Sequence, residues 1–466
     1  MSASQAESHL EALPTELKIK VLRCLRSVSS LKSLTHSSPR FYNAYHSEEY
    51  ARIFEQVVEN ELGSEVFKEA WFVIRAARHL HLRTSNRYSD ELDDTSRKAL
   101  SELLRSGRNL DRSELGITLE DIIWFSKKLP ALQEMTMAFF KSMLENHPIT
   151  GERIALSSLQ GKSPSKSEFC RIQRAFLRIE AFTYLFSLED HDSSAYDQDP
   201  SGPFKEQELN RIYRHDWNRR RRPFELSSEQ QALFLDRYEE WEIEEMICVR
   251  EWYRREYSLL YEQYPKEWKD VWIYQEWIDG DPYRSLEEAA NSEWLREKDW
   301  VDWENVNELS MSKGFELLAE VKRKETGKEK VNLIYSAIDS GAIYFIDLDG
   351  YLSITLEEWN ILRTKDATRE DISIQTLQKC LREQSAWDES GSNAAWCWVR
   401  RQWERDDRKW SQTGKCLRSW GYVMWDAWRL DALGIFRLDV DEIGLHGPKK
   451  FGELLFSERT TEQDDE

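Results

Sequence analysis

Three short segments carry residue types that could bind phosphate or a metal ion. The first, Gly161-Lys162-Ser163, matches the end of a phosphate-binding loop, in which backbone N–H groups and a lysine hold phosphate oxygens. That loop requires a glycine where this chain has Leu156, and it follows a strand, whereas the surrounding pattern is helical. We therefore expect no nucleotide site in this segment.

The second segment, Asp347-Leu348-Asp349-Gly350, matches the centre of a calcium-binding loop. If Gly350 takes the sixth loop position, the first and last positions fall on Phe345 and Leu356, whose side chains have no oxygen to bind calcium. Apolar runs at 343–346 and 351–354 flank the segment. These runs favour a turn within one small β-hairpin, near 343–354, over a calcium site.

The third candidate is a pair of histidines, His79 and His81, which lie two residues apart on a predicted helix. Their side chains point in different directions, so they cannot easily share a metal ion. The chain contains neither His-Glu-x-x-His nor Gly-x-Ser-x-Gly. We therefore predict no catalytic, cofactor or metal site, and a protein that is not an enzyme. A site built from distant carboxylates and tryptophans is the less favoured alternative.

The elements best suited to binding are the short helices predicted over residues 13–45. Pro14 suits the first position of a helix. At about 100° per residue, the first helix carries one apolar stripe made of Leu17, Val21, Cys24, Leu25 and Val28. Leu22 lies at the edge of the stripe, and Ile19 lies on the far side. Because apolar residues occur on both sides, one side needs a cover from later segments or from a partner.

In order and spacing, this segment resembles the F-box family. The matching residues are Leu-Pro-x-Glu-Leu at 13–17, Val21-Leu22-x-x-Leu25, Leu31-x-x-Leu34 and Phe41, where many F-boxes carry tryptophan. The resemblance implies a three-helix unit, residues 10–50, that docks on the Skp adaptor of a Skp–cullin–F-box ubiquitin ligase. The residues that it assigns to docking are Leu13, Pro14, Leu17, Val21, Leu22, Leu25, Leu31 and Leu34.

The role that this resemblance implies is a substrate-recognition adaptor. Its helical remainder would hold a target protein, whose identity the residues do not give, while the Skp adaptor links it to a cullin. Two alternatives stay open: a scaffold or regulatory protein outside the ligase, and an ordinary amphipathic helix packed on its own protein. The discriminating feature is what covers the outer side of Leu17 to Leu25, because a scaffold would cover it with its own tryptophan-rich segments.

Composition restricts the partners and the compartment. A net charge of −20 and a pI of about 5.1 argue against general nucleic-acid or anionic-membrane binding, since both require positive surface. No apolar run is long enough to span a membrane, and residues 1–10 lack the features of a signal peptide. The six cysteines are scattered along the chain. This pattern predicts reduced thiols, and therefore an intracellular protein, cytoplasmic or nuclear. We interpret Arg219–Arg222 as a solvated helix end rather than a nuclear import signal.

Helical periodicity dominates the rest of the chain and predicts a mainly α protein. Helices are expected over 48–61, 66–82, 94–104, 119–129, 132–144, 167–188 and 227–264. The acidic segment 188–204 predicts a loop or linker between one helical domain, 51–187, and a second, 205–456. Residues 457–466 are predicted to form a disordered tail.

Tryptophan distinguishes the second domain, because only Trp71 and Trp124 of the 20 tryptophans precede residue 217. We expect an irregular helical domain packed through aromatic rings, rather than an aromatic ligand site. Its most distinctive segment is 417–430, where apolar residues recur on one face of a predicted helix. This segment is similar to a string near the C-terminus of uncharacterised filamentous-fungal proteins, some of which carry an F-box.

The predicted helix over 417–430 closes the aromatic core. Its structural cluster consists of Trp420, Tyr422, Trp425, Trp428 and Arg429. Within it, Trp425 and Arg429 are one turn apart and are expected to stack as a cation–π pair. Asp426 is expected to bond either Arg429 or Tyr422.

Overall fold

The structure is a computed structural model of the chain. It describes residues 9–47, 49–84, 102, 118–145, 163–186, 234–235, 237–268, 310–311, 313–337, 395–396, 398–399 and 417–437, with side chains in these ranges except 79–84 and 240. Regular structure in these ranges is helical and includes no strand, which confirms the mainly α fold. The predicted hairpin near 343–354, the linker 188–204, the tail 457–466 and most of the helix over 94–104 lie outside the described residues.

The chain divides into two compact units. Unit 1 comprises residues 1–133 and 180–186, and unit 2 comprises residues 134–179 and 187–466. Two long helices, α8 (Leu129–Met143) and α9 (Lys166–Phe186), contribute residues to both units. In this division the first three helices share a unit with the helices that follow them, and the chain passes into unit 2 for its remainder at Ser187.

Unit 1 begins with three short helices, α1 (Thr15–Arg23), α2 (Val28–Ser37) and α3 (Pro39–Tyr45). Serine side chains cap the second and third helices: Ser27 accepts from the N–H of Ser30, and Ser38 accepts from the N–H of Phe41. The sequence predicted Pro14 as the first residue of this helix. In the structure α1 begins at Thr15, and Pro14 is its N-cap. The predicted three-helix unit is present.

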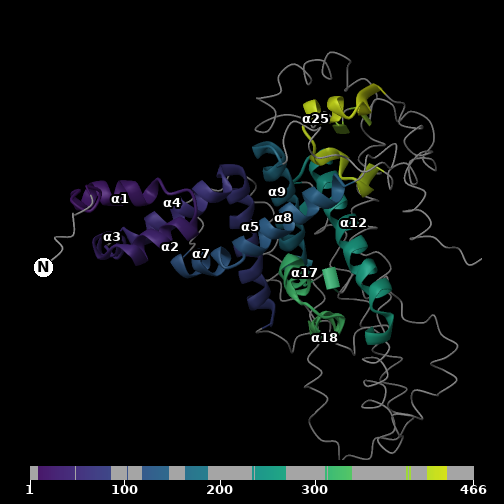
Figure 1. Cartoon of the computed structure of the whole chain (residues 1–466), viewed down its shortest axis with the longest axis horizontal. Helices are drawn as coiled ribbons and strands as arrows, with labels where there is room; N and C mark the ends of the chain where they lie inside the picture. The colour runs from purple at the N-terminus through teal and green to yellow at the C-terminus, as the bar shows by residue number, and fades with distance from the viewer. Residues whose placement is uncertain are drawn as a thin grey trace, which may run out of the picture. The chain divides into compact units, whose positions relative to one another are not determined.

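Three further helices build the rest of unit 1, together with the ends of α8 and α9. They are α4 (Tyr50–Leu62), α5 (Ser64–Thr84) and α7 (Leu119–Ser126). Helix α4 is central, because it packs against α1, α2, α5 and α7 (Figure 1). Only Gly63 separates α4 from α5, and its φ of 82° lies in the region that favours glycine. The predicted helices over 48–61, 66–82 and 119–129 correspond to these elements.

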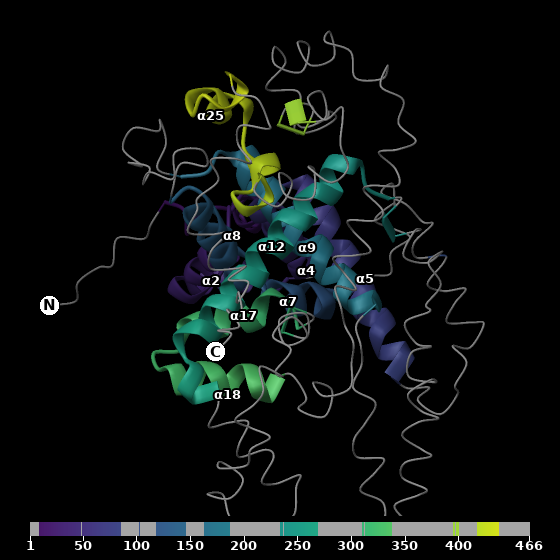
Figure 2. The same ribbon diagram turned by 90° about the vertical axis from the view of Figure 1, so that its right-hand side faces the viewer.

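Unit 2 contains α12 (Glu240–Gln263), α17 (Gly314–Arg323), α18 (Gly327–Ala337) and α25 (Ala427–Ala432), with short 3₁₀ turns η5 (Tyr422–Met424) and η6 (Ile435–Arg437). Helices α9 and α12 lie side by side (Figure 2). Phe176 of α9 is central to their contact, with its ring centroid 5.5–6.3 Å from those of Phe139, Trp252, Tyr253 and Phe315. Edge-to-face packing of this kind stabilises a core beyond the area buried, and it confirms the predicted aromatic packing.

The helix predicted over 227–264 is interrupted, so that prediction was wrong at its N-terminal part. Residues 234–235 are helical, residues 237–239 form a turn, and α12 begins at Glu240. The carboxylate of Glu242 accepts a hydrogen bond of 2.9 Å from the N–H of Glu239, which fixes this start. Glutamate is not a preferred N-cap residue, so the sequence carried no clear signal for the break.

Candidate partner-binding surface

Two buried residues set the orientation of α1. Leu22 is fully buried, and Lys18, one turn before it, is 8% exposed. Helix α1 packs against α3 and α4, so these residues mark the side of α1 that faces the rest of unit 1. The opposite side of the helix faces outward.

The end of α1 is fixed by polar contacts from α4. The side-chain amide of Asn60 donates to the carbonyls of Arg23 (2.7 Å) and Leu25 (2.9 Å), which have no partner within the helix. The carboxylate of Glu61 accepts from the N–H of Val28 at 2.8 Å, at the start of α2. Helices α1 and α2 are therefore both held against α4. These packed helices, here termed the frame, support α1 from behind, and its other side faces outward.

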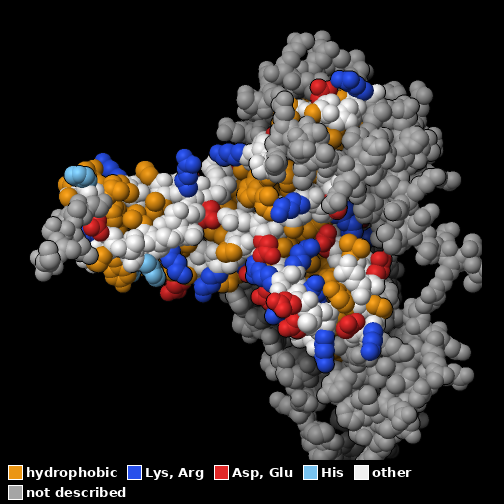
Figure 3. Space-filling model, in the orientation of Figure 1, with side chains coloured by type: hydrophobic (Ala, Val, Ile, Leu, Met, Phe, Trp, Pro, Cys, Tyr) orange, Lys and Arg blue, Asp and Glu red, His pale blue; other side chains and the backbone are white. Residues whose placement is uncertain are grey.

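The outward side of α1 carries an apolar strip, here termed the outer stripe. Its members are Leu13, Pro14, Leu17, Val21, Cys24 and Leu25. Leu17 is 42% exposed, Pro14 and Cys24 are also exposed, and the other three are half-buried. Figure 3 shows hydrophobic side chains gathered over α1–α3 on this face. Contiguous apolar surface rimmed by polar residues is typical of protein–protein contacts, whereas single exposed leucines are ordinary.

Two of the residues assigned to docking lie elsewhere. Leu22 (0% exposed) and Leu31 (3%) are buried in the core of unit 1, as is Phe41. The placement of Leu22 and Leu31 on the docking surface is therefore corrected: they support the frame from inside. Leu34 is half-buried on α2 and can contribute at the edge of the surface.

Two further exposed residues of this region are not among the residues that the resemblance assigns to docking. Leu10 is 53% exposed and Tyr42 is 48% exposed. Residue Glu11 ties the segment before α1 to α3, because its carboxylate accepts from Ser38 at 2.5 Å and its carbonyl accepts from Arg40 at 3.1 Å. The signal for Tyr42 is its place beside Phe41: neighbouring helical residues point about 100° apart, so with Phe41 in the core the side chain of Tyr42 points in another direction.

The segment 417–430 of unit 2 differs from the single helix that the sequence predicted. Gly421 has a φ of 64°, in the left-handed region, and it ends the first turn of helix. The chain continues as η5 and returns to helix at Ala427. Tyr422, Trp425 and Arg429 are nevertheless buried, and Trp428 is half-buried, so the segment closes a core as predicted.

The contacts of Arg429 correct the predicted stacking. Its guanidinium lies 4.6 Å from the ring of Trp428 and 5.3 Å from that of Phe140, and the ring of Trp425 packs edge-on against Phe140 instead. Arg429 forms two hydrogen bonds of 2.7 Å with the carboxylate of Glu168, and both side chains are fully buried. The break at Gly421 redirects the segment and explains the difference.

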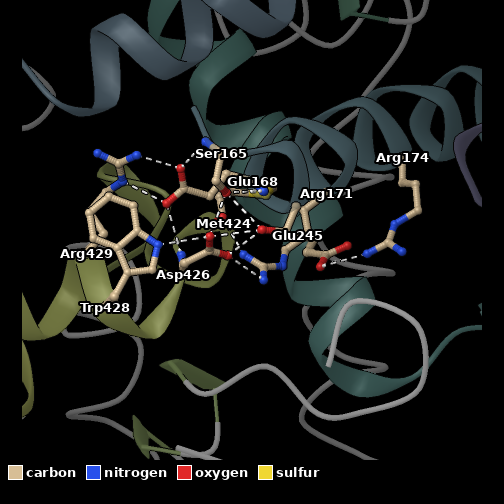
Figure 4. Close-up of polar contacts among 10 residues, drawn as sticks. Ser165, Glu168, Arg171, Arg174, Glu245, Met424, Asp426, Trp428 and Arg429 are labelled. Carbon is tan, nitrogen blue, oxygen red and sulfur yellow. Dashed lines mark hydrogen bonds and ion pairs between the residues drawn. The ribbon is translucent and has the colours of Figure 1, made fainter. Parts of the chain in front are cut away.

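Asp426 also has partners that the sequence did not predict. Its carboxylate accepts from Ser165 (2.6 Å) and Ser167 (2.9 Å) and pairs with Arg171 at 2.8 Å. Figure 4 shows the carboxylates of Glu168 and Asp426 between the guanidinium groups of Arg429 and Arg171. Burial raises the pKa of Asp426, but Arg171 and the two hydroxyls outweigh it, so the pKa is lowered overall.

Helix α12 contributes further buried carboxylates, each facing an arginine. Glu245 accepts from Arg178 at 3.0 Å, and Glu244 accepts from Arg418 at 2.7 Å. Burial raises the pKa of Glu245 to about 6, against the opposing charges of Arg174 and Arg178. Carboxylates held by arginines in this way stabilise a defined packing, so we assign this cluster a structural role.

Several sequence candidates cannot be placed. The side chains of His79 and His81, residues Gly161 and Lys162, and segments 219–222 and 347–350 lie outside what the structure describes. Within the described ranges, no group of three His, Cys, Asp or Glu side chains is arranged to hold a metal ion. None of the described helices has the length and apolar character needed to cross a bilayer.

Comparisons of the chain with known proteins found no match. No protein-family model matches the chain. Neither the curated proteins nor the solved structures include a match.

Proposed function

We propose that the chain is a substrate-recognition adaptor that binds a Skp-type adaptor protein through the outer stripe of α1. The observation that carries the proposal is the exposure of Leu17 on a three-helix unit that already has its own core. Leu22 and Leu31 fill that core, so Leu17 is not needed there. Fully burying an exposed leucine side chain is worth about 1.5–3 kcal/mol. Leu17 has 42% of its surface left to bury, so a partner that covers it would gain part of this stabilisation.

The chemistry of the surface suits a protein partner. An apolar centre with a polar rim is the usual composition of a protein interface. Glu16 and Lys20 of α1 are exposed beside the outer stripe and supply charges of both signs at its edge. Charges at a rim mainly set orientation and association rate, while the apolar centre supplies affinity.

The exposure of α1 also bears on the scaffold alternative. A scaffold that kept the three-helix fold outside the ligase would have the outer stripe covered by its own later segments. Within unit 1, Leu17 keeps 42% of its surface exposed, as the adaptor proposal requires. The helical remainder would then hold the target protein, and the ligase would act on it through the raised local concentration that tethering gives.

A co-expression experiment tests this function. The full chain is produced together with a Skp-type adaptor and a cullin, and the tagged chain is isolated. We expect both proteins to be retained with it, the cullin only when the adaptor is present. Recovery of the folded chain alone, with the adaptor in the unbound fraction, would reject the proposal.

A further inference from the structure

A serine followed by proline occurs at two places in the chain, Ser38-Pro39 and Ser163-Pro164. Proline-directed protein kinases modify serines in this context, and many of them prefer a basic residue three positions after the serine. Ser163 has Lys166 at that position, whereas Ser38 has Phe41. The sequence around Ser163 thus meets both requirements, and the sequence around Ser38 meets one.

The structure separates the two serines further. Ser163 is exposed, Lys166 is exposed, and the hydroxyl of Ser163 makes no hydrogen bond to any residue that the structure describes. Ser38 is 5% exposed. Its hydroxyl donates to Glu11 at 2.5 Å and accepts from the N–H of Phe41 at 3.4 Å. The hydroxyl of Ser163 is therefore accessible in the folded chain, whereas that of Ser38 is buried at the start of α3.

We propose that Ser163 is a phosphorylation site for a proline-directed protein kinase. The hydroxyl oxygen of Ser163 attacks the γ-phosphorus of ATP, an O–P bond forms, and the bond between that phosphorus and ADP breaks. The hydroxyl proton leaves, so the products are phosphoserine, ADP and a proton. The added phosphate brings a charge of about −1.5 to −2 at neutral pH.

The surroundings of Ser163 can accept this charge. Ser163 lies just before the N-terminus of α9, a helix of 21 residues, and the positive end of a helix favours anions. One guanidinium nitrogen of Arg429, Nη2, donates to the carbonyl of Ser163 at 3.4 Å. The other, Nη1, is buried and has no hydrogen-bond partner, although the side chain of Arg429 is 0% exposed. The guanidinium of Arg429, which is paired with Glu168, therefore lies beside the backbone of the residue to be modified.

The test uses the folded full chain, ATP and a cyclin-dependent kinase of the proline-directed class. We expect the intact mass to rise by one phosphoryl group and peptide mapping to place it on Ser163. The S163A variant should take up none, and the K166A variant should react more slowly, because it loses the basic residue. Ser38 serves as the internal control and should stay unmodified.

Two outcomes would overturn the proposal. One is the absence of phosphate on Ser163 while the same kinase preparation modifies a standard Ser-Pro-x-Lys substrate. The other is equal uptake by wild type and S163A. The melting temperature of the phosphorylated chain gives a second readout: we expect it to equal or exceed that of the unmodified chain. A lower value would contradict the acceptance of the phosphate by Arg429 and the start of α9.

Discussion

At the scale of single residues, the core of unit 2 contains charged side chains that are buried away from water. Glu168 and Arg429 are both fully buried, and Arg178 and Glu245 are each 1% exposed. Removing a charge from water costs several kcal/mol, so each of these groups depends on its partner. Loss of one partner leaves the other buried and unpaired, which is the costlier outcome.

The Glu168–Arg429 pair gives the first prediction at this scale. Changing Glu168 to Gln should lower the free energy of unfolding by about 3–5 kcal/mol, because it leaves the charge of Arg429 uncompensated. The matched control is Glu134→Gln, which removes a carboxylate from an exposed pair with Arg323 (38% and 49% exposed). That change should cost about 0–1 kcal/mol. Urea unfolding measures both, and equal losses would contradict a structural role for the buried pair.

A second prediction concerns pH and Glu245. Its pKa is about 6 in the folded chain and 4.5 ordinarily, so the folded state holds a proton that the unfolded state has released. The resulting stabilisation is complete below pH 4.5 and is lost as the pH rises through 6. The difference of about 1.5 units corresponds to a loss of about 2 kcal/mol.

The Glu245→Gln variant isolates this contribution. Other groups, including Asp426 with its lowered pKa, are the same in both chains, so their effects cancel in the difference. We expect the stability of wild type relative to the variant to fall by about 2 kcal/mol across that pH window. A difference that does not change with pH would show that Glu245 titrates normally.

At the scale of elements, glycines decide where helices end. Gly421 has a φ of 64°, and a Cβ atom built on it would lie 2.9 Å from the ring of Phe139. Gly434 has a similar φ of 72° but no atom within 4 Å of such a Cβ. The two positions share the backbone requirement and differ only in the space available.

This pair predicts the result of changing each glycine to alanine. Both changes should cost about 1 kcal/mol or slightly more, because a left-handed backbone is strained for alanine. Gly421→Ala should cost about 1–3 kcal/mol in addition, since Phe139 must move within a packed core. Chemical unfolding of the two variants checks the difference, and equal costs would contradict the close approach of Gly421 to Phe139.

Helices with a clear amphipathic pattern could be predicted from the sequence, and those with local irregularities could not. Helices α4, α5, α8 and α9 begin and end within a few residues of the predicted positions. The apolar spacing of segment 417–430 fits one helix, but Gly421 breaks it, so the prediction of a single helix was wrong. Buried Glu245 could not be predicted, because its partner Arg178 lies 67 residues away in the chain.

The candidate surface could be predicted only in part, because the sequence shows the helix periodicity but not how the helices pack. Periodicity identified the stripe of Leu17, Val21 and Leu25, since these residues are spaced for one helix face. It could not tell that Leu22 and Leu31 face inward, because that depends on where α3 and α4 pack. Burial, and not spacing, separates the residues that support the frame from those free to contact a partner.

At the scale of the whole molecule, the proposal gives the two units different tasks. Unit 1 presents an apolar stripe on a frame held by α4, and unit 2 supplies an aromatic core closed by buried ion pairs. An adaptor requires such a division, because one surface must bind the ligase and another must bind the target. The proposed function therefore depends most on whether the outer stripe binds a Skp-type adaptor.

The most direct measurement of that claim is the dissociation constant for a Skp-type adaptor, determined by calorimetry for wild type, Leu17→Asp and Ile123→Asp. Ile123 of α7 is 39% exposed, close to the 42% of Leu17, so the control adds the same charge to unit 1 outside α1–α3. Leu17→Asp should weaken binding on the order of a hundredfold, and Ile123→Asp should leave it unchanged. Equal affinity of all three chains, or no binding by wild type, would contradict the account.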